Sequence, residues 1–546
     1  MSRSCQCHER LIMRNGFIKV NAATYYTRIY RLLVLGEEKQ INNKFKESLL
    51  DKNTFSVTWE LVPGRGAHEK LQEDAIISAS QAAKDGRIHA LTITDNPGGK
   101  PALSAAYLGM EILKLGIEPL VHFTCKDKNR NQIESELYAM DRAGVRNLLV
   151  MTGDYPSSGF KGRPKPVFDL DSVHVLDLIA NMNKGLESRE SKGIAYHQPS
   201  DFFAGGVVSP FKANESELLA QYYKLKKKIT NEANFIVTQL GFDARKFHEA
   251  LQIIKSYDSN VSVIGNVYIL PFGAGKIMNS NQLPGCVVSD KLLAELDQER
   301  LAEDKGIGAR LLRAAKMYAI MKGMGFDGVH LGGHNIKYEQ IKYIIDKGEE
   351  LSTDWMKFIS EFDYPQSNGF YYFEKDPNTG LNTNKPVNRT NLPVDHPVGL
   401  NYRLMRFIHQ LFFTPDKNLF PFMSRFYNGV NNPRKYTLEH FLKVIGNNCK
   451  DCGDCALLDI AYLCPMSQCP KNQRNGACGG SFNGWCEVFP NEKKCIWVKA
   501  YSMLKAYNEE GELEALYVPP VNWDLYETSA WYNYFTGRDH SSAINK

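Results

Sequence analysis

Residues 54–62 read TFSVTWELV, residues 88–95 read IHALTITD and residues 118–125 read EPLVHFTC. Each stretch is short and rich in β-branched and aromatic residues, which is typical of a buried strand in a parallel sheet. Segments of helical period separate them. The same alternation continues along the chain and predicts eight strands, over residues 54–62, 88–95, 118–125, 146–154, 202–210, 235–241, 261–270 and 326–332.

The segments between these strands predict helices at residues 68–84, 102–115, 132–143, 215–231 and 244–256. Asp243 precedes the last of them and can cap it, because a carboxylate there accepts from the first free N–H groups. Its buried stripe would contain Phe247, Ala250, Leu251 and Ile254. Eight β/α repeats over roughly 280 residues fit a closed barrel better than an open sheet.

The predicted fold class is therefore α/β, with a (β/α)8 TIM barrel, a helical linker region and a small cysteine-rich metal-binding domain. Further helices are expected at residues 338–349, 355–362 and 401–412. The predicted boundaries are a basic N-terminal extension over 1–51, the barrel over 52–335, helices and loops over 336–445, the cysteine-rich module over 446–505 and a tail over 506–546.

Composition excludes several classes of protein. The 546 residues are 43% hydrophobic and 23% charged, as in a globular enzyme, and no apolar run is long enough to span a membrane. The net charge of +5 comes from the first 53 residues, so a nucleic-acid-binding surface is not expected.

The first 36 residues carry six basic side chains against Glu9 alone. This bias indicates either an organellar transit peptide or a start codon placed too early, with Met13 or a later residue as the true beginning. We expect a cytoplasmic protein, with a mitochondrion or related organelle as the alternative.

Polar side chains follow the apolar strands where the strands end. They are Glu60, Thr94, Asp95, His122, Asp154, Gln239 and His330. In a TIM barrel the carboxyl ends of the strands meet at one face, where the active site lies. Any one of these residues could instead cap the next helix, but the whole ring favours a site.

Five of these strand ends carry motifs of a known family. Phe55–Glu60, Thr92–Thr94, Val121–Cys125, Met151–Asp154 and Val237–Gln239 resemble, in order and approximate spacing, the flavin-dependent methylenetetrahydrofolate reductases. The resemblance covers about residues 52–335. It implies reduction of 5,10-methylenetetrahydrofolate to 5-methyltetrahydrofolate, with hydride from flavin N5 and electrons from NAD(P)H or an iron-sulfur partner.

The resemblance also implies roles for individual residues. Glu60 would be the general acid that protonates N10 of the folate, and we expect burial to raise its pKa. Asp154 would act electrostatically beside flavin and pterin. Gln239 and His330 would bind the substrate. The side chains that would bind the flavin are Thr94, His122, Asp154 and Lys228.

Each role has a structural alternative. Glu60 could be merely exposed at its strand end, Asp154 could cap a helix, and Gln239 could make an ordinary barrel-mouth hydrogen bond. Lys228 alone would suggest only a solvated helix face.

The sequence also departs from the family pattern. Thr152 stands where many bacterial members have an arginine, and Ile336 replaces another arginine. Residues 205–211 read GGVVSPF where those members use an aromatic residue and a histidine after the fifth strand. These positions are where the family would contact the distal half of the flavin and the glutamate tail of the folate. The cofactor therefore stays open between FAD and the shorter FMN.

Eight of the twelve cysteines lie in one short stretch. The clustering predicts metal binding in a reducing compartment, and eight thiolates can supply two four-sulfur sites. A [4Fe-4S] cluster and zinc both accept such ligands. The stretch resembles the C-terminal module of acetogen-type methylenetetrahydrofolate reductases, which is associated with iron-sulfur chemistry. The cysteines are Cys449, Cys452, Cys455, Cys464, Cys469, Cys478, Cys486 and Cys495.

Partners and alternatives follow from this interpretation. Beside the small-molecule substrate methylenetetrahydrofolate, we expect a homo-oligomer and an electron-transfer protein partner. One alternative is a non-reductive folate-binding scaffold subunit that carries a metal cluster. The other is a corrinoid-linked methyl-transfer barrel, which would move a methyl group without a redox change.

Overall fold

The computed structural model describes residues 43–190, 193–390, 392–415, 417, 419–429 and 437–542. The described residues from Lys44 onward form one compact unit, which contains the barrel and the described segments that follow it. The expected N-terminal extension lies outside the described residues up to residue 42, so the transit-peptide and early-start interpretations stay predictions.

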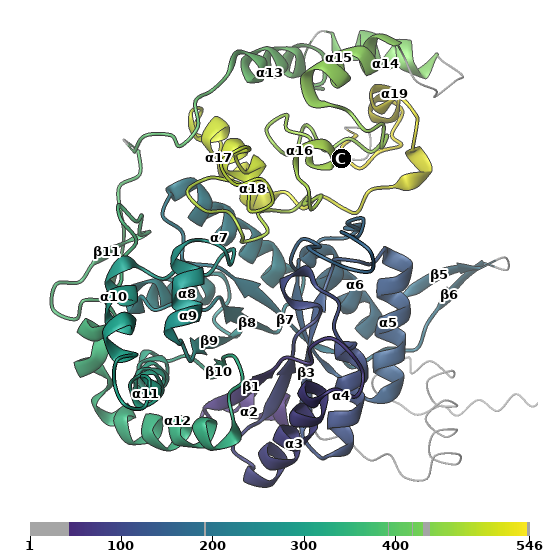
Figure 1. Cartoon of the computed structure of the whole chain (residues 1–546). Helices are drawn as coiled ribbons and strands as arrows, with labels where there is room; N and C mark the ends of the chain where they lie inside the picture. Colours follow the sequence, from purple (N-terminus) through teal and green to yellow (C-terminus); the bar gives the residue numbers. More distant parts are fainter. Residues whose placement is uncertain are drawn as a thin grey trace, which may run out of the picture. The chain divides into compact units, whose positions relative to one another are not determined.

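Eight parallel strands close into a barrel in the order β1-β10-β9-β8-β7-β4-β3-β2 (Figure 1). β1 closes it by pairing with β2 on one side and with β10 on the other, where Ser56 lies opposite Gly328. Every strand falls within its predicted range, so the TIM barrel is confirmed. The bounds are β1 Ser56–Leu61, β2 Ala90–Ile93, β3 Glu118–Thr124, β4 Asn147–Met151, β7 Phe203–Val208, β8 Phe235–Thr238, β9 Ser262–Tyr268 and β10 Gly328–Gly332.

The barrel is surrounded by helices that bury an apolar face against it. Asp243 caps α8 as predicted, because its Oδ1 accepts from the Arg245 N–H at 3.0 Å, and the predicted stripe of that helix is buried. The bounds are α3 Lys70–Asp85, α4 Ala105–Lys114, α5 Arg130–Ala143, α6 Ser172–Lys184, α7 Glu215–Thr230, α8 Ala244–Tyr257, α11 Ile307–Met324 and α12 Tyr338–Leu351.

A short helix before the first strand, α2 Lys44–Leu50, closes the N-terminal end of the barrel. Its Phe45 is fully buried and meets the rings of Phe203 and Phe235 edge-on, at 6.0 and 5.4 Å. Ser48 shares a 2.9 Å hydrogen bond with Ser56 of β1. The packed barrel thus begins before residue 52, and its opposite end stays available for a site.

Further short elements lie in the connections of the barrel and directly after it. They are η1 Pro97–Gly99, the antiparallel pair β5 Glu187–Glu190 and β6 Gly193–Tyr196, α9 Phe272–Asn279, α10 Asp290–Glu299, and the pair β11 Phe373–Lys375 and β12 Asn382–Pro386. The helix expected over 355–362 is the 3₁₀ segment η2 Ser352–Phe362, which follows α12 directly. Within the described ranges, no helix is both long and apolar enough to cross a membrane.

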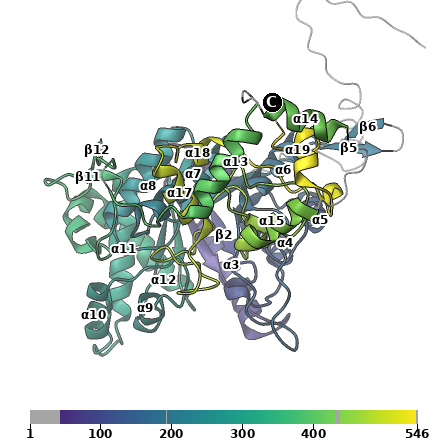
Figure 2. The same ribbon diagram turned by 90° about the horizontal axis from the view of Figure 1, so that it is seen from above.

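The C-terminal part folds onto the carboxyl end of the barrel, where α17 and α18 pack on α7 (Figures 1 and 2). We call residues 437–542 the C-terminal module. Its cysteine stretch is mostly loop. The helices beyond the barrel are α13 Leu400–Phe412, α14 Phe420–Asn428, α15 Thr437–Asn447, α16 Pro465–Gln468, α17 Ile496–Lys505, α18 Glu512–Ala515, η3 Trp523–Leu525 and α19 Ala530–Phe535.

Candidate functional site

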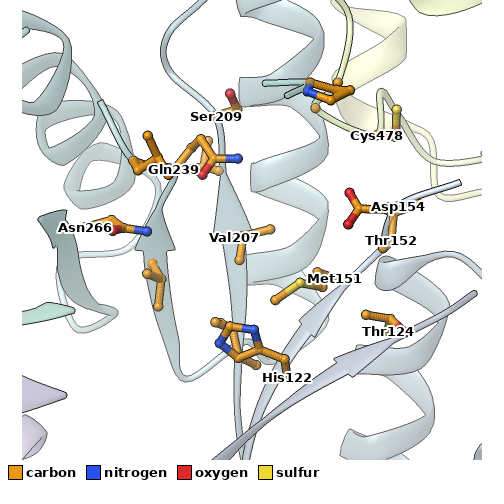
Figure 3. A pocket seen from close by; sticks show the side chains of 18 of the residues that line it. His122, Thr124, Met151, Thr152, Asp154, Val207, Ser209, Gln239, Asn266 and Cys478 are labelled. Carbon is orange, nitrogen blue, oxygen red and sulfur yellow. Dashed lines mark hydrogen bonds between the residues drawn. The ribbon is translucent and has the colours of Figure 1, made fainter. Parts of the chain in front are cut away.

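One cavity of about 300 Å³ lies at the carboxyl ends of the strands, between the barrel and the C-terminal module (Figure 3). The structure brings all the predicted barrel-site residues to this cavity, although they come from six strand ends and one helix. Those that line it are Glu60, Thr94, His122, Asp154, Lys228, Gln239 and His330.

Glu60 and His330 form the acid–imidazole pair of the cavity. β1 and β10 are neighbours, so the two side chains leave adjacent strands, and His330 Nε2 lies 3.7 Å from Glu60 Oε2. The other ring nitrogen of His330 shares a 3.1 Å hydrogen bond with the Thr58 hydroxyl. The Glu60 side chain is 21% exposed, so a ligand in the cavity can reach it.

The expectation that the pKa of Glu60 lies above its ordinary value is wrong. Burial does push the pKa of this carboxyl upward, but the contact with His330 and its charge outweigh that effect. The pKa of Glu60 therefore lies below its ordinary value, and the side chain is ionised near neutral pH.

His122 is held neutral close to this pair, with its ring centroid 6.2 Å from that of His330. Burial lowers its pKa to about 4, and its Nε2 has no hydrogen-bond partner in the part of the chain that the structure describes. Thr94 Oγ1 is also buried without a partner. Buried polar atoms usually find partners, so unpaired ones that line a cavity indicate where a polar ligand would bind.

Asp154 is fixed by the neighbouring loop. Its Oδ2 accepts from the Gly98 N–H of η1 at 2.7 Å, so it caps that turn and not a helix that follows it in sequence. Gly153 before it has φ +83°, and a Cβ there would lie 2.9 Å from Thr124 Cβ. Only glycine fits this turn, which aims the Asp154 carboxylate at the cavity.

Lys228 is buried, which contradicts the alternative of a solvated face, because its side chain faces β7 and lines the cavity. Its ammonium donates to the Val207 carbonyl at 2.6 Å. Burial, with the charge of Lys224, lowers its pKa to about 7. Gln239 accepts from the Leu240 N–H at 2.8 Å, a contact that fixes its amide at the rim.

Sequence reasoning missed several residues that line the cavity. Ser209, Gln221 and Asn266 each bury a polar atom without a partner among the described residues. Asn266 interrupts the apolar strand β9, a signal that could have been used. Lys471 and Glu487 come from the C-terminal module, and nothing local in their sequence points to the barrel.

The eight clustered cysteines form two groups of four along the chain. Cys449, Cys452, Cys455 and Cys464 border one small cavity. Burial and the charge of neighbouring cysteines raise the pKa of Cys452 to about 12. All ten described cysteines are free thiols.

The second group is Cys469, Cys478, Cys486 and Cys495, whose thiols influence one another electrostatically. Cys478 also lines the barrel cavity (Figure 3). Across the described residues, no three His, Cys, Asp or Glu side chains are arranged to hold one metal ion. The metal prediction for the eight cysteines therefore stays a prediction.

Comparisons with known proteins agree with this architecture. Residues 427–524 match the family model described as methylene-tetrahydrofolate reductase C terminal. The curated relative Methylenetetrahydrofolate reductase 2 of Schizosaccharomyces pombe is 23% identical over 258 residues, which are 45% of this chain. The aligned part is only 38% of that relative's length.

Solved structures similar to the chain are more distant. An uncharacterized protein from Clostridium thermocellum that binds two copies of 5-methyl-5,6,7,8-tetrahydrofolic acid has a TM-score of 0.39 at 13% identity, covering 57% of this chain and 99% of its own. EDTA monooxygenase from Chelativorans sp. BNC1 has a TM-score of 0.35 at 9% identity, covering 57% and 95%.

The family model for the barrel matches most of the region that contains the site. It is described as methylenetetrahydrofolate reductase and matches residues 44–347, beginning at helix α2. Because this match covers more than half of the 546 residues, the chain belongs to the methylenetetrahydrofolate reductase family.

Proposed function

We propose that the barrel cavity catalyses flavin-dependent reduction of 5,10-methylenetetrahydrofolate to 5-methyltetrahydrofolate. The observation that carries the proposal is the convergence of Glu60, Asp154 and Gln239 with the flavin-binding candidates on one cavity. Family membership supports the same reaction.

The polar atoms of the cavity fit a flavin, either FAD or the shorter FMN. Thr94 Oγ1, His122 Nε2 and Ser209 Oγ are buried without a partner among the described residues, and all three residues line the cavity. Neutral His122 can donate or accept. When bound, the flavin would supply the hydride for the folate's one-carbon bridge. Thr94, His122, Asp154 and Lys228 would hold it.

The folate ring must open before its one-carbon bridge can be reduced, and opening requires a proton at N10. The pKa of Glu60 lies below its ordinary value, so this carboxylate must first gain a proton from solvent. A bound pterin would exclude water from the cavity and so strengthen the effect of burial. Because burial acts to raise the pKa of this carboxyl, the bound substrate would favour the protonated form of Glu60. We therefore assign proton delivery to the Glu60–His330 pair as a unit, with Glu60 as donor.

Two further side chains would act on the substrate. Asp154 places a fixed carboxylate at the cavity, which stabilises the positive charge that develops on the opened folate. Gln239 has its amide oxygen occupied by the Leu240 N–H, which leaves its NH₂ group to donate to the pterin.

The cysteine module would carry electrons to the barrel. Each group of four thiols matches the donor set of a [4Fe-4S] cluster or zinc, and only the former transfers electrons. Cys464 and Cys469 flank the four-residue helix α16 and belong to different groups. Because only about one helical turn separates these two cysteines, the two groups of four would lie close together. The electron donor would be a protein partner or NAD(P)H.

The test is Glu60→Gln in the anaerobically purified protein, with the two half-reactions measured separately. We expect flavin reduction to stay within about twofold, and reoxidation by methylenetetrahydrofolate to slow by about 100-fold or more, the scale of losing a general acid. Glu118→Gln is the matched control, because Glu118 is a buried glutamate at the first residue of β3, at the end of the barrel away from the cavity.

Equal losses in both half-reactions would contradict the role of Glu60. A protein that binds folate but no flavin would instead support the scaffold alternative. Methyl transfer without any change in the flavin spectrum would support the corrinoid-linked alternative.

A further inference from the structure

A segment of the C-terminal module lies across the end of β4. The Lys471 ammonium donates to the Gly153 carbonyl at 2.8 Å, and the Thr152 hydroxyl donates to Gln473 Oε1 at 3.0 Å. Lys224 on α7 donates to the same Gln473 oxygen at 2.6 Å. These bonds attach residues 471–473 to the loop that carries Asp154.

The ammonium of Lys471 is a buried charge at the cavity. Its side chain is 4% exposed and forms an ion pair with Glu487, and both residues line the cavity beside Asp154. Burying a charge is costly unless it is paired and hydrogen-bonded, and this one has a carboxylate and a carbonyl. Such a placement indicates that the cation acts on a group bound in the cavity.

The cations that the barrel itself places near this turn are hydrogen-bonded to other groups. The residue before Gly153 is Thr152, a neutral side chain that is occupied by its bond to Gln473. Lys126, which packs against Gly153, donates to the Asn96 carbonyl. Lys471, more than 300 positions away in the chain, is a cation that both bonds to this turn and lines the cavity, whereas Lys126 does not line it.

We propose that Lys471 is a flavin-positioning residue, through which the C-terminal module completes the barrel site. The proposal rests on the proposed function. Lys471 holds the Gly153–Asp154 turn by its bond to the carbonyl and places a positive charge next to the bound flavin. Reduction adds negative charge to the flavin, so this cation favours the reduced form over the oxidised form.

The test compares Lys471→Met with Lys212→Met. Lys212 is the matched control, because it is also a buried lysine that joins barrel and module, donating to the Gly479 and Ser481 carbonyls at 2.6 and 2.5 Å, but it does not line the cavity. The readouts are the Kd of oxidised flavin, from fluorescence quenching, and the midpoint potential of the bound flavin.

We expect Lys471→Met to weaken flavin binding about tenfold or more. It should also lower the preference of the site for reduced over oxidised flavin about tenfold. For a two-electron couple this corresponds to a midpoint potential about 30 mV lower. Lys471→Arg should keep the Kd of flavin and the preference for reduced flavin within about threefold of the wild type. Lys212→Met should change these two quantities less than twofold. Glu487→Gln removes a negative charge and should shift the potential in the opposite direction, an effect that loss of folding cannot mimic.

The role is overturned if Lys471→Met and Lys212→Met change the Kd and the potential equally. It is also overturned if Glu487→Gln and Lys471→Met shift the potential in the same direction. A wild-type protein that binds no flavin overturns both this role and the proposed function, so the two failures are distinguishable.

Discussion

Asp171 is the side chain whose removal should separate the C-terminal module from the barrel. This fully buried carboxylate is the N-cap of α6, where Oδ1 accepts from the Val173 and His174 N–H groups at 2.9 and 3.3 Å. Its Oδ2 accepts from the backbone of Arg474 and Asn475 in the module, at 3.2 and 2.9 Å. One group thus satisfies donors from both parts of the molecule.

The magnitude follows from these contacts. Loss of an N-cap costs about 1 kcal/mol, and hydrogen bonds to a charged group contribute about 1.5–3 kcal/mol each. Because such terms are not additive, we expect Asp171→Ala to lower the free energy of unfolding by about 3–5 kcal/mol, the range for breaking one side of a buried charged network.

The pH dependence has a definite sign. Burial raises the pKa of Asp171, but the charges of His174 and Lys224 and the backbone N–H groups outweigh it and hold the pKa well below its usual range. A carboxylate with a lowered folded-state pKa stabilises the protein above its unfolded pKa of about 4. This contribution is lost as the pH falls toward the folded pKa, so the difference between wild type and Asp171→Asn should shrink below about pH 4.

The assay is urea unfolding followed by near-ultraviolet circular dichroism, with limited proteolysis to detect release of the module. Asp141→Ala is the control, because Asp141 makes a part-exposed ion pair with Arg146 at 2.7 Å and should cost about 0–1 kcal/mol. An Asp171→Ala protein within about 0.5 kcal/mol of wild type, with the same proteolysis pattern, would refute the reasoning.

Two further predictions concern the acid pair and the cysteines. His330→Gln should raise the pKa of Glu60, because burial then acts without the opposing contact with His330. In single-turnover measurements, the pH above which folate reoxidises the flavin more slowly should therefore move upward. An unchanged pH profile would contradict the pairing. Cys464→Ser should remove metal from one of the two four-cysteine sites. Cys286→Ser changes a buried cysteine outside both groups and should leave the metal content unchanged. Metal analysis of anaerobically purified protein measures both, and an equal metal content in the two variants would argue against the site.

The barrel could be predicted from the sequence because its signals are local. Each strand is a short apolar run, as in residues 54–62, and its polar end marks the functional face whatever the neighbouring strands are. The Asp243 cap was equally local. These features need no knowledge of which segments meet in space.

The parts that were missed depend on distant contacts. The pKa of Glu60 is set by His330, 270 positions later in the chain, and its direction follows from a 3.7 Å contact that no motif encodes. Lys471 and Glu487 reach the cavity only because the module folds onto α7. Helix α2 was missed because its residues lie before the first strand, within a segment interpreted as an extension.

The central claim is that the barrel cavity passes two electrons to a folate-bound carbon, and a single anaerobic turnover tests it most directly. Protein with its flavin reduced in advance is mixed with methylenetetrahydrofolate while the flavin absorbance and the folate products are followed together. The account predicts that flavin absorbance returns while one equivalent of 5-methyltetrahydrofolate forms. Unchanged flavin absorbance and unreacted folate would contradict it.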